Sequence, residues 1–500
     1  MISDSSRIKL ISHSPLLWVA LLFLLSAKGH LEIIDTEYSV RTALAIIEDG
    51  AMLIEPVDPA VRATAPAITG TDKIYSQYGL GLTIIFLPIV FIGKGIAAIT
   101  SLDQRIPIDF LLSLYNIPFA LLGLWFFHSI LKSLGASEGR ATVALLLLAI
   151  TTAFWKYSVT DFSEVTQATF LLGAIRAVLS KNPHKWRQVS LWLALLVAMK
   201  LAYIVLLCIF VIYLWFEDSR RDDPDRIGSL IDYALFLVPM GLLLATSNYL
   251  RFGSPFETGY GSHATSFSLE YFRRDWFDYL FSTQRGILPF NPILLAALPG
   301  WFLFPKKNHA FAALCLAIAL AWYALACSWI SWQGGWAWGN RLLTPILPVL
   351  FIPIIFVKLG KHTLPLVVLG LALPSFFIQF SAVLTKTHEC SVIRMKVEES
   401  TSLHMENQLP STLRLFIHKL SKGGTKVQAS DIGVESQAIL DLSDYESFHG
   451  FNLWPVHAAK YFGHPRLVRP IGIFLVIILL GTVTLTCLIQ LRRFAQKECS

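Results

Sequence analysis

Apolar stretches long enough to cross a lipid bilayer recur from one end of this chain to the other, and this feature constrains the fold most. A transmembrane helix needs roughly 17 to 25 predominantly apolar residues. Only 15% of the residues are charged, against about 25% in an average soluble protein. The chain is therefore predicted to be an all-α polytopic membrane protein. Its apolar segments are 15–31, 79–99, 108–131, 141–155, 164–180, 188–216, 228–247, 287–304, 309–328, 342–357, 363–384 and 468–490.

The positive charge of the chain follows this topology. The formal net charge is +7, and Lys and Arg cluster in short loops between apolar segments, as membrane insertion requires. No nucleic-acid partner is needed to explain the charge, and the six cysteines form no metal or disulfide framework. Arg7 and Lys9 precede an apolar core of the kind found in signal peptides, but "SAKGH" is a poor cleavage site, so an uncleaved first helix is expected.

Two segments fit the membrane in two ways, and the flanking charges decide between them. If 79–99 crosses and 188–216 is a single span, five cations face outward. If 79–99 only dips into the membrane and 188–216 is a helix pair broken near Lys200, these cations face the cytoplasm, as the positive-inside rule favours. In the dip, Gly79 and Gly81 would allow close backbone approach. The five cations are Lys132, Arg140, Lys181, Lys185 and Arg187.

The second alternative gives about twelve crossings with both termini in the cytoplasm, and it divides the chain into three parts. Residues 1–384 form a transmembrane module, in which the first outer loop, 32–78, leads into the dip at 79–99. Residues 385–467 are the only long polar segment and are expected to pack on the outer face. Residues 468–500 hold the last transmembrane helix and a short cytoplasmic tail.

The first outer loop begins with two carboxylates, Asp35 and Glu37, within "HLEIIDTEYSVRTALAIIEDG". Apolar residues then recur with helical spacing over 40–47, which predicts an amphipathic helix lying on the outer membrane surface. On one interpretation Asp35 is the N-cap of this helix and Glu37 lies in its first turn. On the other, Asp35 is a general base, which a cap would also hold in place.

Other charged residues of the predicted outer face are candidates for binding a substrate, because charge at membrane depth is costly and commonly functional. Lys200, at the helix break, either contacts a substrate or extends to the interface as a snorkelling side chain. Arg341 either binds a substrate or anchors the interface among tryptophans. Asp161 and Glu164 suit either a ligand or a helix N-terminus. Arg285 is either a weaker candidate of this kind or a plain loop charge.

The order of several motifs resembles that of the membrane glycosyltransferases of the GT-C fold, in particular the protein O-mannosyltransferases and the lipid A aminoarabinose transferases. The resemblance covers residues 1 to about 360. In the family the first two acids are usually adjacent, whereas Thr36 separates them here, and 385–467 matches no family element. The motifs are "DTEYSVRTALAIIEDG" (35–50), "YSQYGLGL" (75–82), "WKYSVTDFSE" (155–164), "VAMKLAYIVLL" (197–207), "NYLRFGSPFETGYG" (248–261), "STQRGILPFNP" (282–292) and "WISWQGGWAWGNRLLTPILP" (329–348).

The resemblance implies an inverting glycosyltransferase that moves a sugar from a polyprenyl-phosphate carrier to an acceptor lipid, protein or glycan. It places the reaction on the periplasmic side of a bacterial inner membrane. Asp35 is expected to be the general base, and Glu37 to orient Asp35 or the acceptor. No cofactor is predicted, and a divalent metal stays an open alternative. The expected substrate-binding residues are Asp161, Glu164, Lys200, Arg285, Arg341, Tyr75 and Tyr78.

A transporter or flippase of lipid-linked sugars is the main alternative function. Such a protein should show symmetry between its halves, with charged or broken helices near the bilayer midplane. Here no internal repeat is present and the acids fall at the predicted outer boundary, which favours an enzyme. A catalytically inactive scaffold of the same fold is a third alternative, which would hold if Asp35 were dispensable.

Overall fold

The computed structural model describes most of the chain, including every candidate site residue named above. Residues 55–73 of the predicted first outer loop, and parts of the predicted outer segment, lie outside the described residues. The described residues are 15–54, 74–220, 225–260, 266–331, 333–335, 337–358, 360, 363–386, 389–398, 407–422, 426–432, 436, 438–441 and 450–498.

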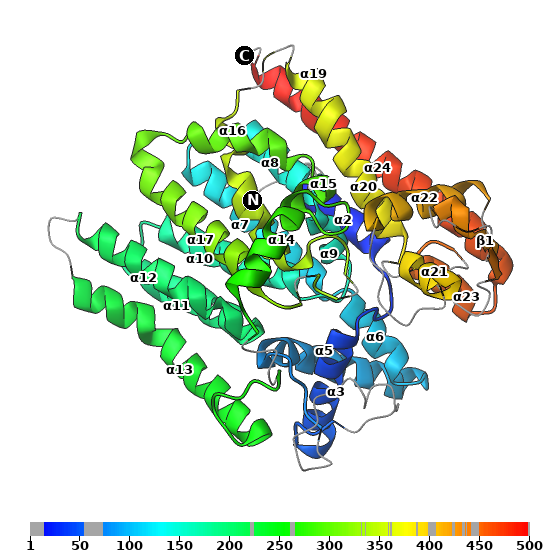
Figure 1. Ribbon diagram of the computed structural model, residues 1–500, viewed down its shortest axis with the longest axis horizontal. Helices are drawn as coiled ribbons and strands as arrows, with labels where there is room; N and C mark the ends of the chain where they lie inside the picture. Colours follow the sequence, from blue (N-terminus) through cyan, green and yellow to red (C-terminus); the bar gives the residue numbers. More distant parts are fainter. Residues whose placement is uncertain are drawn as a thin grey trace, which may run out of the picture.

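The first half of the chain consists of helices, and apart from the stretch between α3 and α5 their connections are short (Figure 1). The predicted surface helix after the first apolar segment is confirmed: it is α3, which ends at Gly50 in the left-handed conformation (φ 65°). The helices are α2 (Pro15–Ser26), α3 (Ile34–Asp49), α5 (Leu80–Thr100), α6 (Arg105–Ser113), α7 (Asn116–Ser133), α8 (Glu138–Thr151), α9 (Ala153–Ser158), α10 (Glu164–Val178), α11 (Lys185–Met199), α12 (Ile204–Asp218) and α13 (Arg226–Phe252).

The second half adds further helices and one small antiparallel ribbon. Its α-helices are α14 (Leu269–Phe281), α15 (Ile287–Phe290), α16 (Leu294–Phe302), α17 (His309–Ser328), α18 (Leu347–Phe351), α19 (Thr363–Val367), α20 (Leu373–Leu384), α21 (Glu389–Glu398), α22 (Gln408–Ser421), α23 (Trp454–Tyr461) and α24 (Val468–Glu498). The ribbon pairs β1 (Lys426–Gln428) with β2 (Ile439–Asp441). Single 3-10 or π turns lie at Leu201–Tyr203, Lys306–Asn308, Arg341–Ile346, Ile352–Phe356, Val368–Ala372, Ala429–Ile432 and Pro465–Leu467.

The all-α membrane fold is confirmed. The expected dip at 79–99 is one continuous helix, α5, which has the length and apolarity of a full span. The total of about twelve crossings stays a prediction, because several apolar segments form helices shorter than a bilayer is thick. Within the described residues, the stretches long and apolar enough to span are Leu80–Thr100, Arg105–Ser133, Leu201–Asp218, Arg226–Phe252, Lys306–Ser328 and Val468–Leu485.

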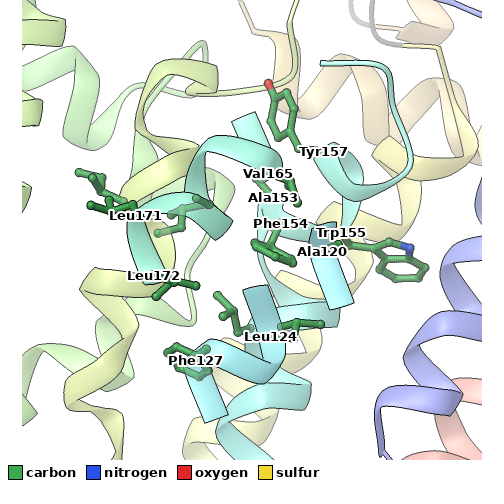
Figure 2. Close-up of a cluster of buried hydrophobic side chains, with 14 of the residues drawn as sticks. Ala120, Leu124, Phe127, Ala153, Phe154, Trp155, Tyr157, Val165, Leu171 and Leu172 are labelled. Atoms are coloured by element: carbon green, nitrogen blue, oxygen red, sulfur yellow. The ribbon is translucent and has the colours of Figure 1, made fainter. Parts of the chain in front are cut away.

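The centre of the bundle is formed by α7, α9 and α10. Figure 2 shows their side chains meeting in one apolar cluster, among them Phe127 of α7, Phe154 of α9 and Leu171 of α10, which are all fully buried. Every residue of α10 except Arg176 is buried, which places this helix inside the bundle. Because close-packed interiors deform little, α10 is a firm base for Glu164, its first residue.

The predicted helix break near Lys200 is confirmed. α11 ends at Met199, Lys200 has extended backbone angles (φ −155°, ψ 117°), and α12 begins after one 3-10 turn. The start of α5 lies against this break. A Cβ atom on Gly79 would come within 2.5 Å of the carbonyl oxygen of Met199, and one on Gly81 within 2.7 Å of the Ala198 backbone. Only glycine permits so close an approach, which fixes the break beside α5.

A buried polar network joins the segment that follows α20 to the start of the chain. Glu32 lies 3.9 Å from the Lys156 ammonium of α9 and accepts a hydrogen bond from the side chain of Asn452. The ammonium of Lys28 is fully buried and donates to the carbonyl oxygens of Val383 and Asn452. Because an unpaired buried charge is strongly destabilising, this network holds residues 28–32 against the end of α20 and Asn452.

Candidate active site

The start of α3 places Asp35, and Asp161 fixes that start. The carboxylate of Asp161 accepts hydrogen bonds from the backbone N–H groups of Glu32 (3.2 Å) and Ile33 (3.1 Å), and its carbonyl accepts one from the Thr36 hydroxyl (2.8 Å). The interpretation of Asp35 as N-cap is wrong, because the helix begins one residue earlier and has no side-chain cap bond. Asp161, from a distant loop, binds the two residues that precede α3, and Asp35, in the first turn of α3, lines a pocket.

Arg341 joins the two carboxylates that face this pocket. Its Nη2 donates to Oδ2 of Asp35 (2.8 Å), and its Nε donates to Oε1 of Glu164 (2.7 Å). Its Nη1 donates to the carbonyl of Gly334 (3.2 Å), and its guanidinium lies 4.3 Å from the ring centroid of Phe162. The Glu164 side chain is only 3% exposed. Three residues predicted from separate motifs therefore meet in one charge-assisted cluster.

Tyr78 completes the surroundings of Asp35. Its hydroxyl donates to Oδ1 of Asp35 (2.7 Å), and the ring of Tyr260 packs edge-on against it. Burial, and then the charge of Asp35, raise the pKa of Tyr78, so its hydroxyl remains a donor at ordinary pH. Each oxygen of Asp35 thus accepts one hydrogen bond. A substrate hydroxyl can reach Asp35 by replacing either partner.

These side chains line one of two cavities that meet at Lys200. The polar pocket has a volume of about 100 Å³, and the apolar pocket about 320 Å³. Lys200, Leu201, Thr258 and Tyr260 line both. The polar pocket is also lined by Asp35, Thr36, Gln77, Tyr78, Gly79, Leu80, Leu82, Phe162, Ser163, Glu164, Gln167, Val197, Ala198, Met199, Leu244, Asn248, Arg251 and Arg341. The apolar pocket is also lined by Ala202, Phe267, Trp322, Leu325, Ala326, Trp329 and Leu342.

Lys200 presents a cation at the junction of the two cavities. Its ammonium lies 5.5 Å from the ring centroid of Trp329, a cation–π contact. Burial, and then the neighbouring charge of Arg341, lower the pKa of Lys200 to about 8, while Glu164 and Asp35 oppose this shift. Lys200 is therefore mostly charged at neutral pH and loses its charge in mildly alkaline solution. Lys200 and Arg341 thus place two positive charges in the wall of the polar pocket.

Arg285 lies outside both pockets and holds the loop that leads to Arg341. It is fully buried and donates to three carbonyl oxygens of the 335–339 loop, two of them at 2.8 and 3.2 Å. It also donates to Oε1 of Gln408 in α22 (3.1 Å), which accepts a backbone N–H from the same loop (2.9 Å). This position gives Arg285 a positioning role instead of the predicted contact with a substrate.

Three further predicted residues do not line the pockets. Glu37 accepts a hydrogen bond from Arg41 of the same helix (2.8 Å) and one from Arg105 (2.6 Å), and the bond from Arg105 ties α3 to α6. Tyr75 lies in an isolated β-bridge at the end of the first loop. Asp161 is buried beneath α3, and burial, followed by the charge of Glu32, raises its pKa to about 7. All three support the walls of the site.

Arg251 and Asn248 line the polar pocket, although the sequence analysis did not predict them as site residues. Nη1 of Arg251 donates to the carbonyl of Ser76 (2.8 Å), and its Nη2 donates to the side-chain oxygen of Asn248 (3.0 Å). The pair thereby holds the segment that carries Tyr78. Both residues lie in the motif "NYLRFGSPFETGYG", where an Asn and an Arg three positions apart share one face of the helix end.

The two pocket carboxylates share one arginine. Within the part of the chain that the structure describes, no three His, Cys, Asp or Glu side chains stand close enough to hold a metal ion. Asp35 and Glu164 both bind the guanidinium of Arg341. A divalent metal stays the open alternative that the sequence left, since waters and phosphate oxygens complete the ligands of such ions.

The chain has the GT-C fold of membrane glycosyltransferases. The lipid A aminoarabinose transferase ArnT from Cupriavidus metallidurans, solved with undecaprenyl phosphate bound, superposes with a TM-score of 0.51 at 13% identity, over 99% of this chain and 79% of that chain. The Archaeoglobus fulgidus oligosaccharyltransferase, tethered to an acceptor peptide, gives 0.50 at 11% identity, over 87% of this chain and 60% of that one. No family model matches this sequence, and no curated protein matches it. At such identities the likeness defines the fold alone.

Proposed function

We propose that this protein is a glycosyltransferase that moves a sugar from a polyprenyl-phosphate carrier to a hydroxyl group of an acceptor. The observation that carries the proposal is the junction at Lys200, where a polar pocket with Asp35 and Arg341 meets an apolar pocket. A polyprenyl-phosphate sugar has three parts that match this site: an apolar chain for the apolar pocket, an anionic phosphate for the junction and a polar sugar for the polar pocket. ArnT, which shares the fold, was solved with undecaprenyl phosphate bound.

In the proposed reaction Asp35 is the general base. The acceptor hydroxyl replaces Tyr78 or Arg341 at one carboxylate oxygen and gives its proton to Asp35 as its own oxygen attacks the anomeric carbon. The bond from that carbon to the phosphate oxygen breaks, and the polyprenyl phosphate leaves with the electron pair. Attack from the face opposite the phosphate inverts the anomeric centre. No covalent enzyme intermediate is required.

The leaving phosphate is stabilised by the cations at the junction. Lys200 lies where the apolar pocket meets the polar one, so a lipid chain in the apolar pocket brings its phosphate to this ammonium. Arg341 supplies the second positive charge, and its planar fork suits phosphate oxygens. Fixed donors beside a leaving group stabilise charge as it develops in the transition state. The apolar walls exclude water, which strengthens this effect.

We place the reaction on the periplasmic face of a bacterial inner membrane. In the topology where 79–99 dips into the membrane and the chain breaks near Lys200, the loops rich in Lys and Arg lie on the side opposite to Asp35. The positive-inside rule makes that side the cytoplasm. The acceptor is a lipid, a protein or a cell-envelope glycan that presents a free hydroxyl group. The related oligosaccharyltransferase, tethered to an acceptor peptide, shows that this fold accommodates a polymeric acceptor.

Transfer and transport can be separated in one reconstituted assay. Proteoliposomes are loaded with a polyprenyl phosphate that carries a radiolabelled sugar, together with envelope extract as the source of acceptor. A transferase releases free polyprenyl phosphate and moves the label into an acceptor. A flippase moves the label across the bilayer with its link to the lipid intact. Transbilayer movement without cleavage, across a panel of donors, would overturn the proposal in favour of the transporter.

The charge on Lys200 should make donor use sensitive to alkali. Its pKa of about 8 means that the cation is present below pH 8 and is lost as the pH rises through that value. We expect kcat/KM for the donor, which reports the free enzyme, to fall roughly tenfold per pH unit above about 8. Lys200→Arg keeps its charge and should remove this fall. A wild-type profile that stays flat to pH 9.5 would contradict the role of Lys200.

A further inference from the structure

One oxygen of the buried Glu164 carboxylate has no partner. Oε1 accepts the Nε–H of Arg341, whereas Oε2 is buried and accepts no hydrogen bond within the described structure. The hydroxyl groups nearby donate elsewhere: that of Tyr203 to Gln167 (2.6 Å), and that of Tyr157 to a backbone carbonyl. A buried carboxylate oxygen without a donor is costly. Because Glu164 lines the polar pocket, a bound ligand can supply that donor.

The charges around the polar pocket limit what this ligand can carry. Three cations and two carboxylates line it within the described residues, a net charge of +1: Lys200, Arg251 and Arg341 against Asp35 and Glu164. A sugar phosphodiester of a polyprenol has one negative charge, which balances this. An additional ammonium or carboxylate on the sugar would leave one buried charge unbalanced, and such a charge is strongly unfavourable.

We propose that the transferred sugar is uncharged and that Oε2 of Glu164 accepts a hydrogen bond from one of its hydroxyl groups. This inference rests on the proposed function and specifies the donor for the same site. Glu164 is then a residue that determines specificity, with its two oxygens divided between Arg341 and the sugar. A site built around such a hydrogen bond rejects analogues that lack the hydroxyl, because the carboxylate oxygen is left unpaired in the complex.

The test is a series of donors in which each sugar hydroxyl is removed in turn. The wild type and Glu164→Gln are assayed for release of polyprenyl phosphate from a neutral hexosyl donor and from each of its monodeoxy analogues. In the wild type, one deoxy position should cost roughly tenfold to a hundredfold in kcat/KM, the range expected for a hydrogen bond to a charged group. In Glu164→Gln the side-chain oxygen can still accept from Arg341, but the other side of the amide presents N–H groups. Removing the same sugar hydroxyl should therefore cause no further loss in kcat/KM in this variant.

The same assay compares sugars of different charge. Donors that carry an amino sugar or a uronic acid should turn over at least tenfold more slowly than the neutral donor. Faster transfer of either charged sugar would overturn the charge argument. Equal losses for every deoxy analogue in both proteins would overturn the role of Glu164. If the wild type cleaves no donor at all, the proposed function itself fails, which is a different result from loss of selectivity alone.

Two variants guard against a fold defect. Glu48→Gln makes the same change at an exposed position of α3, where Glu48 pairs with Lys94 outside the pockets, and should leave the deoxy pattern unchanged. Glu164→Asp keeps the carboxylate and shortens the side chain, so it should lose the same deoxy selectivity. If Glu164→Gln does not fold, Glu164→Asp carries the test, and unchanged selectivity in it would contradict the proposal.

Discussion

Replacing Asp35 by asparagine should lower kcat for sugar transfer by roughly 100- to 10,000-fold, the usual contribution of a general base. The side chain keeps its shape, so Tyr78 can still donate to it, and Arg341 keeps its bond to Glu164. Removal of one negative charge makes the pocket more positive. Donor binding should therefore be unchanged or tighter, which separates a lost base from a damaged pocket. The measurements are single-turnover release of polyprenyl phosphate and equilibrium binding of a radiolabelled donor.

Asp49→Asn is the matched control for this change. Asp49 is the last residue of the same helix and is exposed, so its replacement should leave both transfer and binding as in the wild type. If Asp35→Asn transfers sugar normally, Asp35 is only a partner of Arg341 that fixes α3, and the base must be sought elsewhere. If both donor binding and transfer are lost, the carboxylate serves to build the pocket.

The features of this fold that were readable in the sequence are local ones. A helix over 40–47 and a break near Lys200 follow from residue spacing and from charges next to apolar segments. Gly79 and Gly81 indicated a close backbone approach, and α5 does lie against the break. The helix and the break depend on neighbours within a few turns of helix, whereas the glycines indicated a close approach without its partner, which lies about 120 positions away. Propensity and periodicity therefore suffice to find the helix and the break.

The partners of the charged side chains could not be predicted from the sequence. Asp35 and Arg341 are separated by 306 positions, and only the tertiary fold brings them together. Asp161 was expected to bind a substrate, yet it fixes the start of α3. Arg285 was also expected to bind a substrate, yet it binds the loop beside Arg341. In each case the residue type indicated a strong interaction, while the tertiary fold selected the partner.

Replacing Arg341 by lysine should abolish most activity although the charge is kept. The guanidinium donates from Nε to Glu164 and from Nη2 to Asp35, two carboxylates on different helices. One ammonium cannot reproduce this planar arrangement. We expect kcat/KM for transfer to fall by at least about 100-fold, since a small displacement of Asp35 is costly for catalysis. Arg341→Gln, which removes the cation that binds both carboxylates, should also lower the free energy of unfolding by about 3–5 kcal/mol.

The comparison of these two variants separates geometry from charge. Arg187→Lys is the control, because Arg187 pairs with Asp232 outside both pockets and should tolerate the change. If Arg341→Lys retained wild-type transfer, a single positive charge would suffice, and the shared fork would have no role in placing Asp35. We expect Arg341→Lys to lose transfer but keep near-normal thermal stability, and Arg341→Gln to lose both. This result would show that the planar guanidinium positions the base, while its positive charge stabilises the site. In that case the cluster is a catalytic arrangement that also contributes to folding.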